Sequence, residues 1–245
     1  MRYILVLCLL FLFACKKNTT KNEEPGCQLA SIIRSDFEYP IKYEDKKIVS
    51  VGHETGYGFR LTYGNTGKLA RVESPFENPY YRTDLFYNDE GKIAIEKVYE
   101  KYMETWLEDR VSFYTYTNGK LTSIRETYQR IGPPSQYDHE VIWEGDNIRT
   151  IAIRSGSTIV CNLQFTYDTT QKNPMTAFAD LYYSDNLGPY YKYALFTSAN
   201  SLIKAENTCP SPDVTNISYE FNDKNLLRKV VANGYELITY SYDCR

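Results

Sequence analysis

The stretch Val111–Tyr128, VSFYTYTNGKLTSIRETY, has the features of a β-hairpin. Two runs rich in tyrosine, threonine and other residues favoured in strands flank the pair Asn118-Gly119. An Asn-Gly pair readily adopts the positive φ angles that a two-residue hairpin turn requires, so it is a strong local signal for a hairpin. The sequence therefore predicts antiparallel strands at Val111–Tyr116 and Ser123–Tyr128.

The pattern of this hairpin recurs along the chain as an aromatic residue, a short turn-rich spacer and an aliphatic residue. Clear copies are Tyr43-EDKK-Ile48, Tyr63-GNTGK-Leu69, Tyr87-NDEGK-Ile93, Tyr116-TNGK-Leu121, Trp143-EGDN-Ile148 and Phe221-NDKN-Leu226. Weaker copies are Tyr167-DTTQKNP-Met175 and Phe196-TSANS-Leu202, and Tyr242 begins a further one. The spacing between successive copies suffices for two strands and two connections in each.

The repeats predict an all-β fold: a single large antiparallel up-and-down meander of roughly 18 short strands. Because open twisted sheets rarely exceed about ten strands, we expect strong curling or closure into a barrel-like sheet. A membrane-spanning barrel is the alternative, and its strands need about nine to eleven residues with an unbroken apolar outer face. Charged pairs within the expected strands, Glu96-Lys97, Arg125-Glu126 and Arg228-Lys229, favour the first interpretation.

Composition agrees with this fold and excludes one class of function. The 245 residues include 24 tyrosines against 2 tryptophans and 3 methionines, a balance that suits pleated sheets better than helices. The formal net charge of -3 gives no sign of the strongly basic face that nucleic-acid-binding proteins carry. We therefore expect one globular domain that binds no nucleic acid.

The N-terminus has the form of a bacterial lipoprotein signal peptide, residues 1–14. Its apolar run is too short to span a bilayer as a helix, and it ends Leu12-Phe13-Ala14-Cys15, with leucine at -3 and a small residue at -1. We expect cleavage before Cys15, acylation of its thiol, a flexible tether through residue 26 and a folded domain over residues 27–245. The alternative is an ordinary signal peptide in which the cysteine occurs by chance.

These features together resemble a known group of proteins. The Y-x-Y-x-x-x-G-K-L-x-x-I pattern around Tyr116 is similar to YD-type repeats. With the Cys15 motif, the lysine-containing tether and Cys27 at the start of the domain, the chain resembles bacteroidete lipoproteins that carry a porin-like domain of unknown function. The resemblance covers about residues 27–244. It implies a curled or closed antiparallel sheet and no established activity. We expect the chain to be lipid-anchored at the outer membrane, on either its periplasmic or its cell-surface face.

An up-and-down meander places alternate connections at opposite ends of the sheet. The repeat turns are short and polar and share one end, which we call the short-turn rim; the other connections, several of them long, form the long-loop rim. Aromatic residues gather in the long connections: Tyr57, Phe76, Tyr80, Tyr81, Trp106, Tyr137, Tyr190 and Tyr191. Because loops on a rigid scaffold often bind ligands, these rings are a candidate site for carbohydrate or another envelope ligand. The alternative is that they pack the loops against the barrel.

The sequence contains no catalytic motif. HExxH, GxSxG, P-loop and GxGxxG patterns are absent, and the two histidines, His53 and His139, are far apart and expected at the surface of the long-loop rim. We therefore expect no metal, no cofactor and no catalytic residue, and the leading hypothesis is a non-enzymatic binding or scaffold protein. Two alternatives stay open: a glycan-acting hydrolase whose carboxylates converge at the rim, and a purely structural envelope component.

The cysteines predict how the sheet closes. Cys8 is lost with the signal peptide and Cys15 is acylated, which leaves Cys27, Cys161, Cys209 and Cys244. With an even number of strands, the first and last are neighbours, and Cys27 and Cys244 both fall at the short-turn rim. We therefore expect a Cys27–Cys244 disulfide across the seam and a second between Cys161 and Cys209. The alternative is four reduced or mixed thiols.

Overall fold

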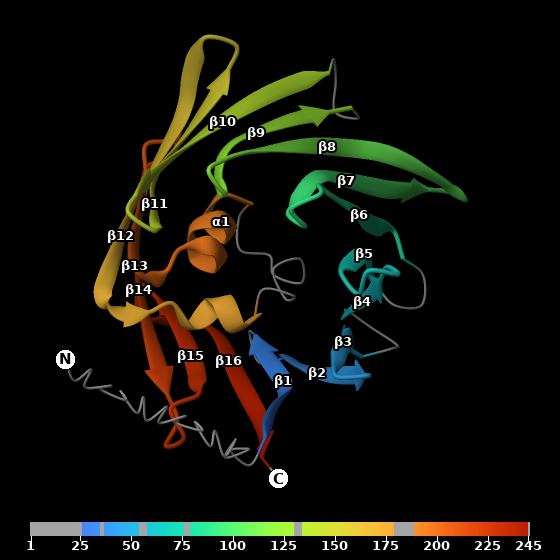
Figure 1. The fold of residues 1–245 in the computed structure, drawn as a ribbon, viewed down its shortest axis with the longest axis vertical. Helices are drawn as coiled ribbons and strands as arrows, with labels where there is room; N and C mark the ends of the chain where they lie inside the picture. The colour runs from blue at the N-terminus through green and yellow to red at the C-terminus, as the bar shows by residue number, and fades with distance from the viewer. Residues whose placement is uncertain are drawn as a thin grey trace, which may run out of the picture.

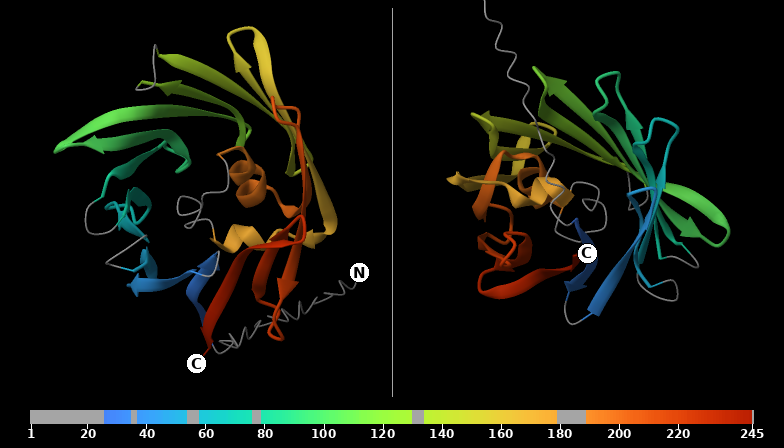
Figure 2. Two further views of the ribbon diagram at one scale, coloured as in Figure 1. Left: turned by 180° about the vertical axis from the view of Figure 1, so that it is seen from behind. Right: turned by 60° about the horizontal axis from the view of Figure 1, so that its bottom comes forward.

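In the computed structural model, the chain forms one closed barrel of antiparallel strands (Figures 1 and 2). The structure describes residues 26–34, 37–53, 58–75, 79–129, 134–178 and 189–244, except for the side chains of residues 189–192. The predicted signal peptide, Cys15 and all but the last residue of the tether lie outside these ranges. The elements are β1 (Cys27–Arg34), β2 (Phe37–Glu44), β3 (Lys47–Gly52), β4 (Gly58–Tyr63), β5 (Leu69–Ser74), β6 (Tyr81–Tyr87), β7 (Ile93–Tyr102), β8 (Thr105–Thr117), β9 (Lys120–Tyr128), β10 (Ser135–Glu144), β11 (Asn147–Ser155), β12 (Thr158–Lys172), α1 (Pro189–Thr197), β13 (Asn200–Asn207), β14 (Asp213–Phe221), β15 (Leu227–Ala232) and β16 (Tyr235–Cys244).

The strand order confirms the predicted meander. Each strand pairs with its neighbours in sequence, and β1 pairs with β16 to close the ring. The barrel has 16 strands instead of roughly 18. The two missing strands were expected between Tyr167 and Phe196, where the weaker repeat copies predict two hairpin turns. In the structure β12 continues to Lys172, and the chain returns to the wall only at β13.

Between β12 and β13 in the chain, α1 lies inside the ring of strands (Figures 1 and 2). Residues 174–178 form a 3-10 turn, and the ring of Phe178 stacks on Tyr240 of the wall with centroids 4.7 Å apart. The side-chain amide of the buried Asn173 donates to the carbonyls of Leu195 (2.7 Å) and Ser198 (2.8 Å) at the end of α1. Apolar residues that resemble strand residues in the sequence therefore fill the lumen here.

The repeated aromatic residue has one structural role throughout the barrel. On each even-numbered strand an aromatic side chain donates a hydrogen bond to a main-chain carbonyl of the preceding strand. The eight bonds are Tyr43 to Leu29, Tyr63 to Ile48, Tyr87 to Leu69, Tyr116 to Ile93, Trp143 to Leu121, Tyr167 to Ile148, Tyr219 to Leu202 and Tyr242 to Leu227. In β14 the donor is Tyr219. The aromatic residue predicted for this repeat, Phe221, is exposed. These bonds satisfy carbonyls at the short-turn rim, where the two strands no longer pair: the β3–β4 ladder, for example, stops at Ser50 and Arg60.

The Gly-Lys pair of the repeat places a lysine side chain against the next hairpin. In four consecutive hairpins the turn lysine lies over the aromatic ring of the next repeat: Lys47 over Tyr63, Lys68 over Tyr87, Lys92 over Tyr116 and Lys120 over Trp143, at 5.0 to 5.3 Å from the centroid. Glycine precedes three of these lysines at φ angles of 77 to 79°, which other residues rarely adopt. The repeat therefore links each hairpin both to the strand before it and to the hairpin after it.

The two faces of the wall differ in polarity. Side chains alternate along a strand, so Ile124 and Ile151 point into the buried core, whereas their neighbours Arg125 and Thr150 do not. Ion pairs cross the outer face, including Arg125 with Asp138 (2.8 Å) and Lys204 with Glu206 (3.0 Å). The lumen is thus mainly apolar and the outer wall is charged, the reverse of what a lipid-facing wall requires.

Two disulfides join strands that are neighbours in the barrel. Cys27 pairs in register with Cys244 across the β1–β16 seam and is bonded to it, with the Cα atoms 4.0 Å apart. Cys161 of β12 is bonded to Cys209, which follows β13. The connectivity is the one expected from the sequence, although several strands were expected between Cys161 and Cys209. They come together because β12 and β13 are neighbours in the barrel, with no strand of the wall between them.

Candidate functional site

A cluster of charged residues lies inside the barrel, on the inner faces of β7 to β10. It consists of Glu96, Arg110, Glu126 and His139, one residue from each strand. Leu85 and Ile124 are inward-facing neighbours of Glu96 and His139 across the strands, which places the charged side chains in the lumen. Glu126 and His139 are 2% and 1% exposed. Polar and ionisable groups buried to this extent require hydrogen-bonding partners.

The partners of the cluster are its own members. Nη2 of Arg110 donates to Oε1 of Glu96 at 2.7 Å, and Nη1 lies 3.7 Å from Oε1 of Glu126. Nε2 of His139 lies 3.2 Å from Oε2 of Glu126. Arg110 therefore lies between two carboxylates, and Glu126 lies between Arg110 and His139.

Hydroxyl groups surround the two carboxylates. Glu126 accepts from Ser112 and Tyr128, both at 3.3 Å, and Glu96 accepts from Tyr114 at 3.0 Å. The hydroxyl of Tyr114 also lies 3.0 Å from that of Tyr193 on α1. The charged cluster is therefore connected to the helix inside the barrel as well as to the wall.

These contacts fix the charge states of Glu126 and Arg110. Burial by itself would raise the pKa of Glu126, but the hydrogen bond with His139 and the charge of Arg110 outweigh burial, so its pKa lies below the ordinary value of 4.5. Burial disfavours the charged guanidinium of Arg110, but the charges of Glu96 and Glu126 outweigh it and raise its pKa. Both groups are therefore charged at neutral pH.

The sequence pattern does not predict this cluster. We expected His139 at the surface of the long-loop rim, and this is wrong, because His139 points into the lumen; His53 is exposed as expected. The signal that the sequence contains is alternation, since Glu126 lies two residues from the buried Ile124. Bulges in the ladders, such as that between Val98 and Tyr99, weaken this signal because they shift the alternation by one residue.

The predicted aromatic site is only partly assembled at the long-loop rim. Tyr80 and Tyr81 are in contact there, with ring centroids 4.7 Å apart. Tyr137 packs edge-on against Tyr128 at 5.9 Å, which joins it to the charged cluster below. Trp106 is on the outer face of β8, where the guanidinium of Arg82 lies over its ring at 5.0 Å. The predicted aromatic residues therefore do not form one continuous surface at the rim.

The other predicted aromatic residues do not extend this site. Tyr57 and Phe76 lie outside the described residues. Tyr190 and Tyr191 were expected in a connection at the long-loop rim, and that is wrong, because both belong to α1, which lies inside the barrel. Their side chains are not among those that the structure describes. The helix is in the lumen because its apolar residues, such as Leu195 and Ala194, are buried there.

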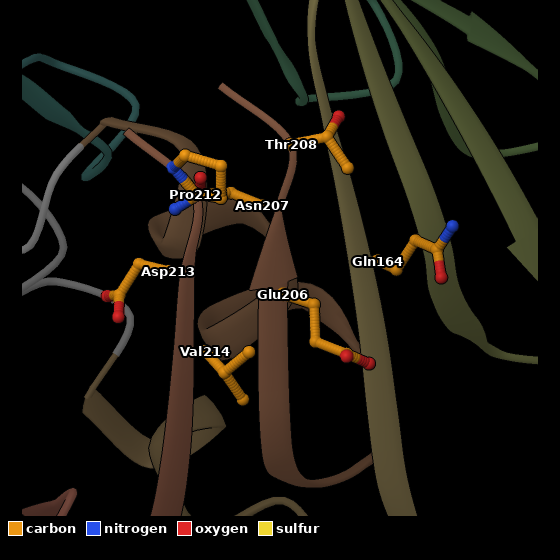
Figure 3. A pocket seen from close by; sticks show the side chains of 7 residues that line it. All are labelled: Gln164, Glu206, Asn207, Thr208, Pro212, Asp213 and Val214. Carbon is orange, nitrogen blue, oxygen red and sulfur yellow. The ribbon is translucent and has the colours of Figure 1, made fainter. Parts of the chain in front are cut away.

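A shallow pocket of about 460 Å³ lies on the wall formed by β12, β13 and β14, near the long-loop rim (Figure 3). Its lining residues are Gln164, Glu206, Asn207, Thr208, Pro212, Asp213 and Val214. None of them belongs to the charged cluster or to the predicted aromatic site. In the part of the chain that the structure describes, no group of His, Cys, Asp and Glu residues is arranged to hold a metal ion.

Comparison with known proteins supports the fold. No protein-family model and no curated protein matches the chain. Among solved structures it is similar to a porin-like protein from Bacteroides vulgatus, with 13% identity and a TM-score of 0.57 over 88% of this chain and 98% of that one. A porin-like protein from Bacteroides uniformis matches with the same identity and coverage and a TM-score of 0.42.

Proposed function

We propose that this chain is a lipid-anchored protein of the outer membrane, without enzymatic activity, that binds an envelope component through its long-loop rim. The observation that carries the proposal is the contrast between the two ends of the barrel. Turn residues such as Asp45, Glu90 and Lys120 make the short-turn rim polar, whereas exposed aromatic residues, including Tyr80 and Tyr81, lie at the long-loop rim. Exposed aromatic side chains on a rigid scaffold are typical of binding surfaces.

The Cys15 motif and the resemblance to bacteroidete lipoproteins with YD-type repeats support the lipid anchor. The porin-like neighbour agrees with a location in the envelope. Within the described ranges, no helix is long and apolar enough to cross a membrane. Attachment through acyl chains at Cys15 requires no such helix.

The alternative of a glycan-acting hydrolase has one observation in its favour, the convergence of Glu96 and Glu126. In such enzymes one carboxylic acid is kept protonated to act as the general acid. Here the pKa of Glu126 is lowered, and Arg110 lies between the two carboxylates. The cluster is therefore better suited to holding the wall and α1 together than to acid–base catalysis, which favours the non-enzymatic function.

Replacement of the acylated residue tests the anchor. We expect Cys15→Ser to abolish labelling with a palmitate analogue, because acylation requires the thiol. Cys8→Ser is the matched control and should leave the labelling unchanged. Labelling that survives in Cys15→Ser would contradict the proposed anchor.

Ligand binding at the rim is tested with the Cys15→Ser chain, which carries no acyl group, in a thermal-shift screen of envelope glycans. A ligand that binds only the folded state raises the melting temperature, and the rise should disappear in Tyr80→Ala/Tyr81→Ala. Phe113→Ala, an exposed aromatic of the outer wall, is the control. Release of product from a bound glycan would instead support the hydrolase.

A further inference from the structure

The most exposed apolar side chains all lie at hairpin tips of the long-loop rim. Among the described residues these are Tyr235 (80% exposed), Met103 (78%), Phe37 (67%), Tyr102 (56%) and Ile159 (52%). The next most exposed apolar side chains, which include Phe86 and Ile142 on the outer wall, are at most 47% exposed. Burial of such side chains away from water would be favourable, so their exposure leaves this free energy unused.

The tips are distributed around the ring. Phe37 begins β2, Tyr102 and Met103 form the β7–β8 tip, Ile159 follows the β11–β12 turn, and Tyr235 follows the β15–β16 turn. In Figure 1 the β7–β8 and β11–β12 hairpins project on different sides of the barrel, and β1, β2 and β16 lie on a third. A small ligand or a narrow groove can contact one tip at a time, whereas a flat surface wider than the barrel can contact all of them.

The backbone conformation of Met103 is unusual for an exposed apolar residue. Its φ angle is 53°, in the left-handed region that is costly for most side chains. The other described non-glycine residues with positive φ are polar: Asp45, Lys46, Asn118, Asn225 and Asn233. Met103 alone combines this conformation with an apolar side chain, and at 78% exposure it gains little packing within the chain.

At two of the tips, the lysine beside the exposed side chain forms an ion pair within the chain. Lys101 lies 3.1 Å from Glu104 at the β7–β8 tip, and Lys229 pairs with Glu236 next to Tyr235. These cations are therefore not available as a basic patch for anionic headgroups or acidic proteins. Attraction of the rim to its partner must come mainly from apolar contact.

We propose that the long-loop rim docks on the surface of a lipid bilayer, with Phe37, Met103, Ile159 and Tyr235 inserted in the interfacial layer. Tyrosine, phenylalanine and other apolar side chains partition into this layer, and a leaflet is the flat, apolar and extended surface that the tips require. The proposal names the partner of the rim and so rests on the proposed binding function, but it does not depend on acylation of Cys15.

The tether permits both attachments to the same membrane. Residues 16–26 span up to about 40 Å when extended, whereas a strand of eight to ten residues is about 30 Å long. Gly26 precedes β1 at the short-turn rim. The tether is therefore long enough to pass along the wall, so that acyl chains on Cys15 and the long-loop rim can reach one leaflet.

Flotation with vesicles of phosphatidylcholine tests the docking, using the chain from residue 15 with Cys15→Ser so that acyl chains cannot contribute. We expect the protein to float with the vesicles, and the triple variant Phe37→Ser/Met103→Asn/Tyr235→Ser to bind at least about tenfold more weakly, given the burial lost. The matched control is Phe86→Ser/Phe113→Ser on the outer wall, which should bind like the parent. Circular dichroism establishes that all three proteins are folded.

Three results would overturn the proposal: no flotation of the parent, equal flotation of the tip variant, or binding only to anionic vesicles that 0.5 M salt abolishes. A glycan that raises the melting temperature while the vesicles bind nothing would support the proposed binding function and reject the lipid partner. Flotation together with unlabelled Cys15 in cells would support docking and reject the anchor. The docking and the proposed function can therefore fail separately.

Discussion

Glu126 and Arg125 are adjacent in β9, yet one side chain is buried in the lumen and the other is exposed in an outer ion pair. The sequence predicts a strand here but not its orientation, because both neighbours are charged and the bulges nearby shift the alternation. The buried position makes Glu126 part of the charged cluster. The rim aromatics Tyr80 and Tyr81 are easier to predict from the sequence than the charged cluster, because their assignment to a loop does not depend on the orientation of a strand.

We expect Glu126→Gln to lower the free energy of unfolding by about 3 to 5 kcal/mol at neutral pH, because Arg110 and His139 lose their buried carboxylate. The pKa of Glu126 is lower in the folded state than its ordinary value of 4.5. Its contribution is therefore complete above that value and is lost as the pH falls through the folded-state pKa. Denaturant unfolding at a series of pH values should show the difference between the two proteins closing in acid.

Glu140→Gln is the control for this series. Glu140 is exposed and lies 3.5 Å from Arg154, so its loss should change the free energy of unfolding by less than about 1 kcal/mol. A difference between the parent and Glu126→Gln that stays constant down to pH 2 would mean that the charge of Glu126 does not stabilise the fold.

The hairpins are the elements that the sequence predicts best, because their signals are local. Asn118 and Gly119 adopt the expected positive φ angles, and the turn lies between the predicted strands. The segment inside the barrel depends on contacts distant in sequence, such as Asn173 with Leu195 and Phe178 with Tyr240. No local pattern distinguishes its apolar residues from those of a strand.

The hydroxyl groups of the repeat stabilise the hairpins one by one. Tyr116 donates to the carbonyl of Ile93 at 3.0 Å, and burial raises its pKa to about 12. We expect Tyr116→Phe to lower the free energy of unfolding by about 1 kcal/mol, since the carbonyl loses its donor while the ring stays in place. Tyr235→Phe, at an exposed hairpin tip, should have no effect in the same denaturant titration; equal effects would show that the hydrogen bond contributes nothing specific.

At the scale of the whole molecule, closure follows from the number and order of the strands. A ring of antiparallel strands closes without a parallel pair only when their number is even, so the sequence could place Cys27 beside Cys244 although its strand count was too high. Removing two expected strands left the seam unchanged but made β12 and β13 neighbours. The lumen and the two rims follow from the same closure, because each strand then has one inner face and two ends.

The seam disulfide should stabilise the closed barrel more than the second disulfide does. In the chain-entropy model, a cross-link between residues 217 positions apart contributes on the order of 5 kcal/mol, and one between residues 48 positions apart about 4 kcal/mol. We therefore expect Cys27→Ser/Cys244→Ser to unfold at a lower denaturant concentration than Cys161→Ser/Cys209→Ser, and both at a lower concentration than the parent. The reverse order would contradict this prediction. It would mean that the length of the loop closed by each disulfide does not determine how much the disulfide stabilises the barrel.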